Sequence, residues 1–167
     1  NVYGKEDTLV TIQIDMLLAE RFGMYYTDEN GEKKLPYIIH RTSLGCYERT
    51  LAYLIETYAG ALPTWMAPEQ VRFLPVTDRA VDYCKDQAAN LTAQGYRVTV
   101  DTRSEKIGKK IRDAQMEKIP YMLVVGDRDI EAGTVSPRHR ADGDLGAMTL
   151  DAFTAVLKDV VDNKLKK

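Results

Sequence analysis

Arg49 and Gly45 are the first residues of this sequence whose types and spacing could do chemistry. Apolar residues at helical spacing from position 44 onward predict a helix, with Arg49 opposite the apolar stripe and Gly45 one turn earlier near the same face. A guanidinium stacks on flat rings and binds phosphate oxygens through two N–H groups, and a glycine lets a ligand approach the backbone closely. The pair indicates a site for a flat or charged ligand; a surface arginine near a helix start is the simpler alternative.

His40 is the candidate metal ligand of the sequence. It follows apolar residues at the end of a predicted strand and precedes Arg41. A single histidine is more often structural or solvated, and no other His, Cys or carboxylate lies at ligand spacing from it. The chain therefore could not complete a four-coordinate zinc site by itself.

Basic residues crowd one stretch of the second half of the chain, and two more follow on a later predicted strand. They are Arg103, Lys106, Lys109, Lys110, Arg112, Arg138 and Arg140. The whole chain has 23 Lys and Arg against 25 Asp and Glu, a formal net charge of -2. Any contact with nucleic acid must therefore be local to such a patch, and a solvated helix face is the alternative.

The elements that must position Arg49 and His40 lie in the first sixty residues. The alternation of residues 11–15 predicts a half-buried strand, and short strands are predicted at 24–27 and 33–41 around an Asn-Gly turn. Pro36 makes the last of these irregular or places it at a sheet edge. A helix then runs from Leu44 to a glycine at position 60. The pattern is an antiparallel meander followed by one helix.

A proline-containing segment at residues 61–68 predicts a boundary between two domains, 1–62 and 69–167. Beyond it we expect strands at 71–76, 96–100, 120–125 and 134–140, helices capped by Asp78, Ser104 and Thr149, a polar turn at 126–133 and a loop at 142–146. This order predicts an α/β fold: a mixed, mostly parallel sheet flanked by helices on both faces, preceded by the antiparallel strands and helix of the first domain.

The composition is that of an ordinary globular protein, with 44% hydrophobic and 29% charged residues. It excludes wholesale disorder and a disulfide-dense miniprotein, and no apolar run approaches the roughly 18 residues of a membrane span. The two cysteines, Cys46 and Cys84, are far apart, which favours reduced thiols over a bridge. The chain begins at Asn1 without an initiator Met, so we expect a piece of a longer protein with exposed apolar strand surface.

Several segments carry a resemblance that composition could not. Residues 40–49, His-Arg-Thr-Ser-Leu-Gly-Cys-Tyr-Glu-Arg, resemble motif 3 of the class II aminoacyl-tRNA synthetases, a strand followed by a helix with Gly-x-x-x-Arg. The segments that narrow the resemblance to threonyl-tRNA synthetases are 11–15, 20–22 and 58–60 in the first domain, with 105–112, 120–123 and 144–146 in the anticodon-binding domain. The resemblance covers essentially the whole chain.

The resemblance implies roles on the catalytic side. Arg49 would pack on the adenine of ATP and reach its phosphates, offsetting charge as the adenylate forms. Gln13 would line the amino-acid pocket with Thr11 beside it. His40 would be the third protein ligand of a catalytic zinc whose other ligands precede this chain, so the Zn²⁺ site here is incomplete. One departure is the Asp-Thr pair ending at Thr8, where the family usually has Trp-Gln and the Gln helps bind ATP.

The resemblance also implies partners. Lys106, Arg112, Glu131 and Arg140 match positions that contact the anticodon loop of tRNA(Thr). The parent enzyme would be a cytoplasmic homodimer, with no membrane association, that ligates threonine to its tRNA with ATP through threonyl-adenylate. Because motifs 1 and 2 would precede Asn1, we expect this polypeptide alone to be inactive.

Three other hypotheses stay open at this point. The chain could be a stand-alone, non-enzymatic paralogue that binds tRNA or another RNA through its second domain. It could be an interaction protein that kept the fold and lost RNA binding. It could also come from a sister synthetase of the same class, for proline or histidine.

Overall fold

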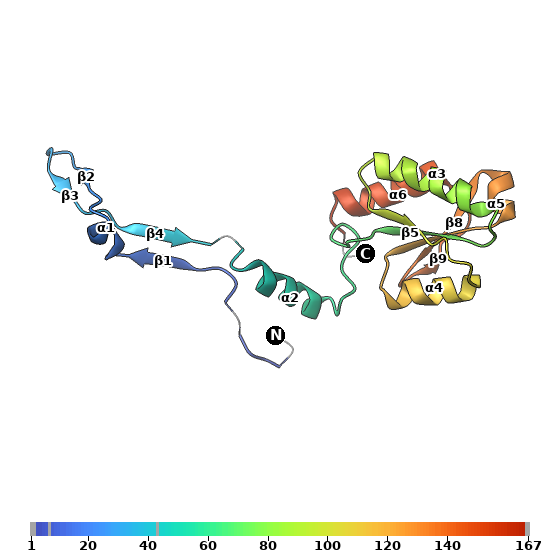
Figure 1. Ribbon diagram of the computed structural model, residues 1–167, viewed down its shortest axis with the longest axis horizontal. Coiled ribbons are helices and arrows are strands. Elements are labelled where there is room, and N and C mark those ends of the chain that lie inside the picture. Colours follow the sequence, from blue (N-terminus) through green and yellow to red (C-terminus); the bar gives the residue numbers. More distant parts are fainter. Residues whose placement is uncertain (1–2, 7, 43, 166–167) are drawn as a thin grey trace. The chain divides into compact units, whose positions relative to one another are not determined.

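The computed structural model of the chain describes residues 3–6, 8–42 and 44–165 (Figure 1). The chain divides into two units, Asn1–Thr57 and Tyr58–Lys167. None of the described helices is both long enough and apolar enough to cross a membrane.

The described residues of the first unit form two short antiparallel ribbons and two helices. Its elements are β1 (Ile12–Asp15), α1 (Leu18–Arg21), β2 (Tyr26–Thr27), β3 (Lys33–Lys34), β4 (Ile38–Arg41) and α2 (Tyr47–Thr57). β1 pairs with β4, and this register sets Gln13 opposite His40, while β2 pairs with β3. The predicted antiparallel meander and helix are confirmed, although the strand expected at 33–41 is split into β3 and β4, with Pro36 in the gap, since proline has no N–H for the ladder.

Local hydrogen bonds explain two turns of this unit. The Asp28 carboxylate accepts from the backbone N–H groups of Asn30 and Glu32, both at 2.9 Å, and closes the hairpin between β2 and β3. The Asp15 carboxylate accepts from the N–H groups of Leu17 and Leu18 at 2.8 and 2.9 Å. These bonds satisfy amides at the start of α1, a helix that the sequence analysis did not predict.

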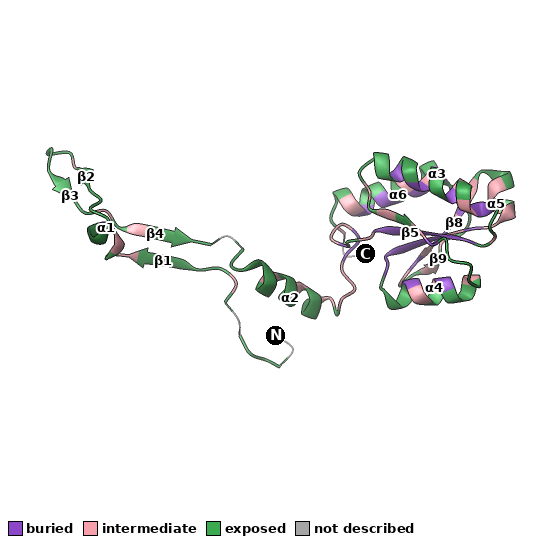
Figure 2. Cartoon of the chain, viewed as in Figure 1, coloured by how far each residue is buried: buried purple, intermediate pink, exposed green. Residues whose placement is uncertain are grey.

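The apolar side chains of the β1–β4 ribbon are exposed, as expected for a detached piece of a sheet. Ile12, Ile14 and Ile39 have 67%, 64% and 67% of their surface exposed. Figure 2 shows this unit almost entirely in the colour of exposed residues, and Ala19 is its one buried residue among those described. The stability of this unit therefore cannot come from a hydrophobic core of its own.

The second unit contains a six-stranded sheet. Its strands are β5 (Val71–Pro75), β6 (Val98–Val100), β7 (Tyr121–Val125), β8 (Thr134–His139), β9 (Gly143–Asp144) and β10 (Met148–Thr149). The order across the sheet is β10-β8-β7-β5-β6, with β9 also paired to β8. β5 runs parallel to β6 and β7, whereas β8 runs antiparallel to each of its neighbours, so the sheet is mixed as predicted.

Helices cover both faces of this sheet. They are α3 (Ala80–Ala93), α4 (Ile107–Met116), α5 (Asp127–Ala132) and α6 (Leu150–Asp162). Figure 1 shows α3 and α6 on one face and α4 on the other. Phe73, Leu123 and Phe153 belong to the core under α3 and α6, and Leu74 and Met122 belong to the core under α4. The α/β fold predicted from the sequence is confirmed.

The helix starts and one turn differ from the sequence analysis. α3 begins at Ala80 and α4 at Ile107, so neither Asp78 nor Ser104 is the capping residue. The cap at Thr149 is confirmed, because its Oγ1 accepts from the N–H of Ala152 at 3.3 Å. The polar turn predicted at 126–133 is wrong: these residues form α5, whose start is fixed by the Gly126 N–H bond to the carboxylate of Asp129 at 2.9 Å.

Candidate functional site

Arg49 lies in the first turn of α2, and Gly45 precedes that helix. The predicted helix start at Leu44 is therefore wrong by three residues, and Gly45 is not an interior helix residue. Gly45 adopts φ +65°, and a Cβ at this position would collide with the carbonyl oxygen of Leu9. The glycine is thus required by its backbone conformation and by a neighbouring segment, and the expectation that it clears space for a ligand is wrong.

The Arg49 side chain contacts the same neighbouring segment. Its Nη1 donates to the carbonyl oxygen of Thr8 at 2.9 Å. A cavity of about 490 Å³ lies beside it, lined by Gly4, Lys5, Glu6, Leu9, Arg49, Ala52, Tyr53 and Glu56. This volume is that of a small-molecule site, and its lining combines two cations and two carboxylates with one aromatic ring.

The second hollow of this unit contains His40. It has a volume of about 700 Å³ and is lined by Gln13, Ile14, Asp15, Met16, Leu17 and His40. His40 Nε2 lies 3.6 Å from the carboxylate of Asp15. The structure thus brings together two predicted site residues, His40 and Gln13. The third, Thr11, lies just before β1, where its hydroxyl is 3.2 Å from that of Thr42.

The donors around His40 fit one protein ligand of a metal. Its side chain is 46% exposed, and the nearby Asp15 carboxylate can orient the ring, the usual second contact of a metal-binding histidine. The pKa of Asp15 is lowered, mainly by the N–H groups of Leu18 and Leu17 and further by His40. Among the described residues, no three His, Cys, Asp or Glu side chains are grouped to hold a metal. A zinc here would need ligands from outside this set.

The basic patch of the second unit is partly used inside the fold. Lys110 is 4% exposed, and its Nζ donates to the carbonyl oxygens of Pro75 and Asp101, both at 3.1 Å. Arg103 pairs with the carboxylates of Asp101 at 2.7 Å and Asp113 at 3.0 Å. Both cations thus complete structural contacts; Lys110 is buried, whereas the Arg103 side chain remains half-exposed.

Four residues were predicted to contact RNA, and the structure places them on different elements. Lys106 is exposed just before α4, Arg112 is exposed on α4, and Glu131 is exposed on α5. Arg140 follows β8 and is half-buried. Its Nη1 donates to the carbonyl of Lys118 at 2.9 Å, and its Nη2 donates to Ala61 and Leu62 at 2.9 and 2.7 Å.

Arg140 therefore differs from the other three. Burial lowers the pKa of its guanidinium, and Tyr121 opposes this shift. Three backbone carbonyls accept the hydrogen bonds of the guanidinium. The Nη1 and Nη2 donors of Arg140 are thus bonded within the fold. The contact between Arg140 and the anticodon loop stays a prediction.

Arg138 belongs to the predicted basic patch but not to the four residues expected to contact the anticodon loop. It pairs with Met122 in the register of β7 and β8, so its side chain lies on the α4 side of the sheet. It is one-third exposed, its Nη1 lies 3.6 Å from the carboxylate of Asp144, and within the described part of the chain its Nε has no acceptor. Side chains two residues apart lie on the same side of a strand, so Arg138 would share its side of the sheet with Arg140 if the strand continued. β8 ends at His139, however, and Arg140 lies beyond it.

The arrangement defines a class of protein. An α/β unit has exposed cations on the α4 side of a mixed sheet, and it follows a strand–helix unit that holds an arginine beside a cavity. These are the features of the C-terminal part of a class II aminoacyl-tRNA synthetase.

The comparisons with known proteins agree. Residues 70–160 match the model of the anticodon binding domain, and residues 1–58 match the tRNA synthetase class II core domain of the G, H, P, S and T enzymes. The chain belongs to the anticodon-binding domain family, and it is homologous to the C-terminal portion of threonyl-tRNA synthetases. The family resemblance is therefore confirmed, and nothing in these comparisons supports the stand-alone paralogue.

Similar proteins of known identity are threonine–tRNA ligases. A threonine–tRNA ligase of Clostridium perfringens strain 13 is 60% identical over 153 residues, which cover 92% of this chain and 24% of the relative. One from Clostridium botulinum strain Eklund 17B is 56% identical over 164 residues, covering 98% and 26%. The crystal structure of the RNA binding domain of threonyl-tRNA synthetase from Cryptosporidium parvum Iowa II has a TM-score of 0.81 at 32% identity, covering 96% of this chain and 41% of that one. The chain thus spans about a quarter of the length of these ligases.

Proposed function

We propose that this chain supplies motif 3 and the anticodon-recognition domain of an enzyme that ligates threonine to tRNA(Thr) with ATP through threonyl-adenylate. The single observation that carries this is the presence, in one chain 60% identical to a threonine–tRNA ligase, of both a class II core segment and an anticodon-binding domain. We assign the core segment to residues 1–62 and the anticodon-binding domain to 69–167. The parent enzyme is proposed to be a cytoplasmic homodimer.

On the catalytic side, the Arg49 guanidinium is proposed to stack on adenine and to bind the phosphates. The threonine carboxylate attacks the α-phosphate of ATP, and pyrophosphate leaves. A fixed cation that offsets the charge developing on the phosphates lowers this barrier. Support comes from the cavity beside Arg49, which also contains Lys5 and Tyr53.

Gln13 and Thr11 are proposed to line the amino-acid pocket, and His40 to hold the zinc together with ligands outside this chain. Zinc in such a site supplies coordination for the amino and hydroxyl groups of threonine. A site built to bind a hydroxyl rejects valine far better than an apolar pocket does. The pairing of Gln13 with His40 across β1 and β4 supports a shared pocket.

On the RNA side, Lys106 and Arg112 are proposed to bind the anticodon loop, with Arg138 on the same side of the sheet. Glu131 can accept hydrogen bonds from an exposed base edge. Single-stranded loops are where proteins read RNA sequence, because their unpaired bases present all their edges. Support comes from the exposure of Lys106, Arg112 and Glu131 on and around α4 and α5, and from the partial exposure of Arg138 on β8.

The experiment compares the full-length enzyme with this chain alone. The enzyme should charge tRNA with a threonine anticodon and fail with tRNA altered at its last two anticodon bases. The isolated chain should bind the threonine anticodon stem-loop more tightly than the altered one, without charging either. Equal affinity for the two stem-loops at moderate salt would contradict anticodon recognition.

A further inference from the structure

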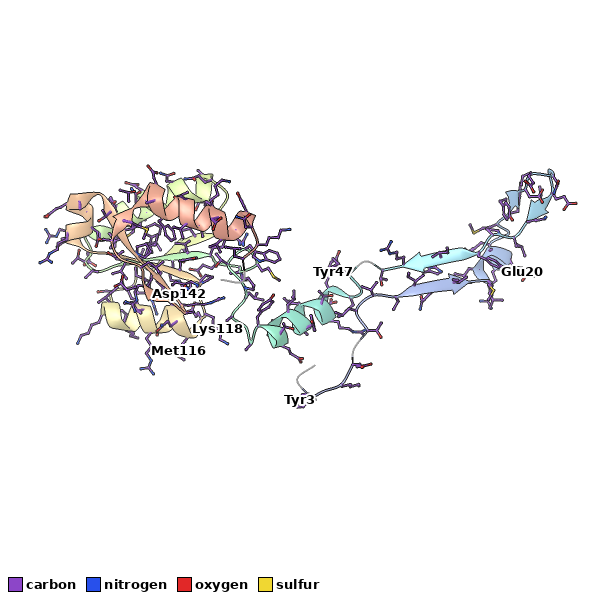
Figure 3. The ribbon with its side chains drawn as sticks, turned by 180° about the vertical axis from the view of Figure 1, so that it is seen from behind. Tyr3, Glu20, Tyr47, Met116, Lys118 and Asp142 are labelled. Atoms are coloured by element: carbon purple, nitrogen blue, oxygen red, sulfur yellow. The ribbon has the colours of Figure 1, made fainter. Side chains whose placement is uncertain are left out.

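The two units are joined by a segment that two side chains bind to the second unit. We call residues 58–69 the linker, and the side chains of Lys118 and Arg140 the clamp. Arg140 bonds the carbonyls of Ala61 and Leu62, and Lys118 Nζ donates to the carbonyl of Ala59. Arg140 also bonds the carbonyl of Lys118, so the two parts of the clamp are joined. Figure 3 labels Lys118, which lies two residues past the last residue of α4, Met116.

The rest of the linker is fixed in the same manner, through backbone carbonyls. Arg97 donates to Ala67 at 2.8 Å and to Trp65 at 2.9 Å, and the Gln70 amide donates to Thr64 at 3.1 Å. These acceptors follow one another along the linker, which therefore has no free flexible stretch between Ala59 and Ala67 within this unit.

The backbone at the clamp is in a conformation that needs support. Ala59 has φ +48° and Lys118 has φ +61°, and neither is glycine. Left-handed conformations of such residues cost free energy and persist where surrounding contacts determine them. The hydrogen bond between these same two residues is such a contact.

The clamp stands at the ends of the elements that carry the RNA-facing cations. Arg140 directly follows β8, which presents Arg138, and Lys118 follows α4, which presents Arg112. The linker itself directly follows α2, the helix that carries the motif 3 arginine, Arg49, in its first turn. The clamp thus ties the start of the linker to both RNA-contacting elements.

We propose that Arg140 is a positioning residue, which with Lys118 makes the linker a rigid extension of the anticodon-binding domain, so that charging of bound tRNA depends on the fixed conformation of the linker. This rests on the proposed function. A guanidinium suits the task because its fixed fork serves three carbonyl acceptors, whereas an ammonium on a flexible stem does not. A loose linker would leave tRNA bound and its acceptor end poorly placed, since small misplacements cost large factors in rate.

The experiment uses two clamp variants, Arg140→Ala and Lys118→Gly. Lys118→Gly removes the Nζ donor while suiting the left-handed backbone, so its fold should persist. Arg79→Ala is the matched control, because Arg79 is 83% exposed and pairs with Asp127 of α5. In the isolated chain, exchange of the Ala61 amide hydrogen should quicken about tenfold or more in both variants and stay unchanged in the control.

In the full-length enzyme, Lys118→Gly should lower kcat for charging by about tenfold while KM for tRNA and threonine-dependent ATP–pyrophosphate exchange stay within about twofold. Arg140→Ala should keep its affinity for the anticodon stem-loop, and Arg140→Lys should not restore charging. Loss of stem-loop affinity in Arg140→Ala with an unchanged linker would overturn the proposal in favour of base reading. If amide exchange at Ala61 quickens and charging stays normal, the positioning role of Arg140 is overturned while the proposed function stands. If the wild type neither binds the stem-loop nor charges tRNA, both fall together.

Discussion

The Arg49 guanidinium donates to the carbonyl oxygen of Thr8 at 2.9 Å. This bond uses the backbone of Thr8, so it does not depend on which side chain occupies that position. The family's usual glutamine is absent here, yet the segment still fixes the orientation of the motif 3 arginine. Gly45, which allows the neighbouring Leu9 carbonyl to approach α2, completes this arrangement.

Replacing Arg49 should impair adenylate formation. In the full-length enzyme, Arg49→Ala should lower the rate of threonine-dependent ATP–pyrophosphate exchange by about a hundredfold or more, because a charge-offsetting donor is lost. Arg49→Lys should recover little, since an ammonium neither stacks on adenine nor binds in two places. Arg21→Ala, an exposed arginine of α1, is the control. Exchange at the wild-type rate in Arg49→Ala would place the ATP site elsewhere.

Two glycine substitutions should have opposite effects on stability. Gly45→Ala should lower the free energy of unfolding of its unit by about 2 kcal/mol or more, since the site combines a left-handed backbone with a collision against Leu9. Gly108→Ala lies inside α4 with open space around the added methyl group, and should raise stability by roughly 0.5–1 kcal/mol. Urea unfolding of the chain, followed by hydrogen exchange in each unit, measures both. A harmless Gly45→Ala would contradict the geometry at Leu9.

The sequence predicted what depends on local pattern and missed what depends on distant neighbours. The continuous apolar run of β7 reflects a strand covered on both faces, and the stripes of α3, α4 and α6 reflect helices packed on that sheet, so the α/β fold was predictable. α5 has only six residues between Gly126 and Gly133, too few to show a helical period. Position 45 requires glycine because of Leu9, which lies 36 residues (45 − 9) earlier in the chain. Arg138 and Arg140 have different environments because Arg140 binds the backbone of the linker. No local pattern contains either relationship.

The buried thiol of Cys84 should titrate far above its usual range. Burial raises its pKa to about 12 from an ordinary value near 9, with the charge of Lys110 opposing and that of Asp129 adding to the shift. As the pH rises, the unfolded chain therefore loses the thiol proton before the folded chain does. The protonated thiol contributes its full share to the free energy of unfolding below pH 9, and this share declines between about pH 9 and 12, by up to about 1.4 kcal/mol per pH unit. The stability difference between wild type and Cys84→Ala should narrow over that window. At pH 8, iodoacetamide should modify the exposed Cys46 and leave Cys84 intact; equal labelling would contradict its burial.

His40 should determine metal content and amino-acid selectivity together. Purified full-length His40→Ala should lose its zinc by elemental analysis, and its preference for threonine over valine in ATP–pyrophosphate exchange should fall by several orders of magnitude. Asp15→Asn keeps an oxygen that can accept from the N–H groups of Leu17 and Leu18 but removes the charge beside His40, and should weaken zinc binding by about tenfold or more. A His40→Ala enzyme that retains both its zinc and its selectivity would remove His40 from the metal site.

Arg138 should read the anticodon, whereas Arg112 should bind phosphate. Arg138→Ala should weaken binding of the threonine anticodon stem-loop by about ten- to a hundredfold and reduce discrimination against altered bases, since its guanidinium is one-third exposed and its buried Nε has no acceptor among the described residues. Arg112→Ala should weaken binding to all stem-loops equally and reduce the salt dependence by about one phosphate contact. Titrations at three salt concentrations separate the two effects. A uniform loss in Arg138→Ala, with discrimination intact, would assign it to the backbone instead, because phosphate contacts carry no sequence information.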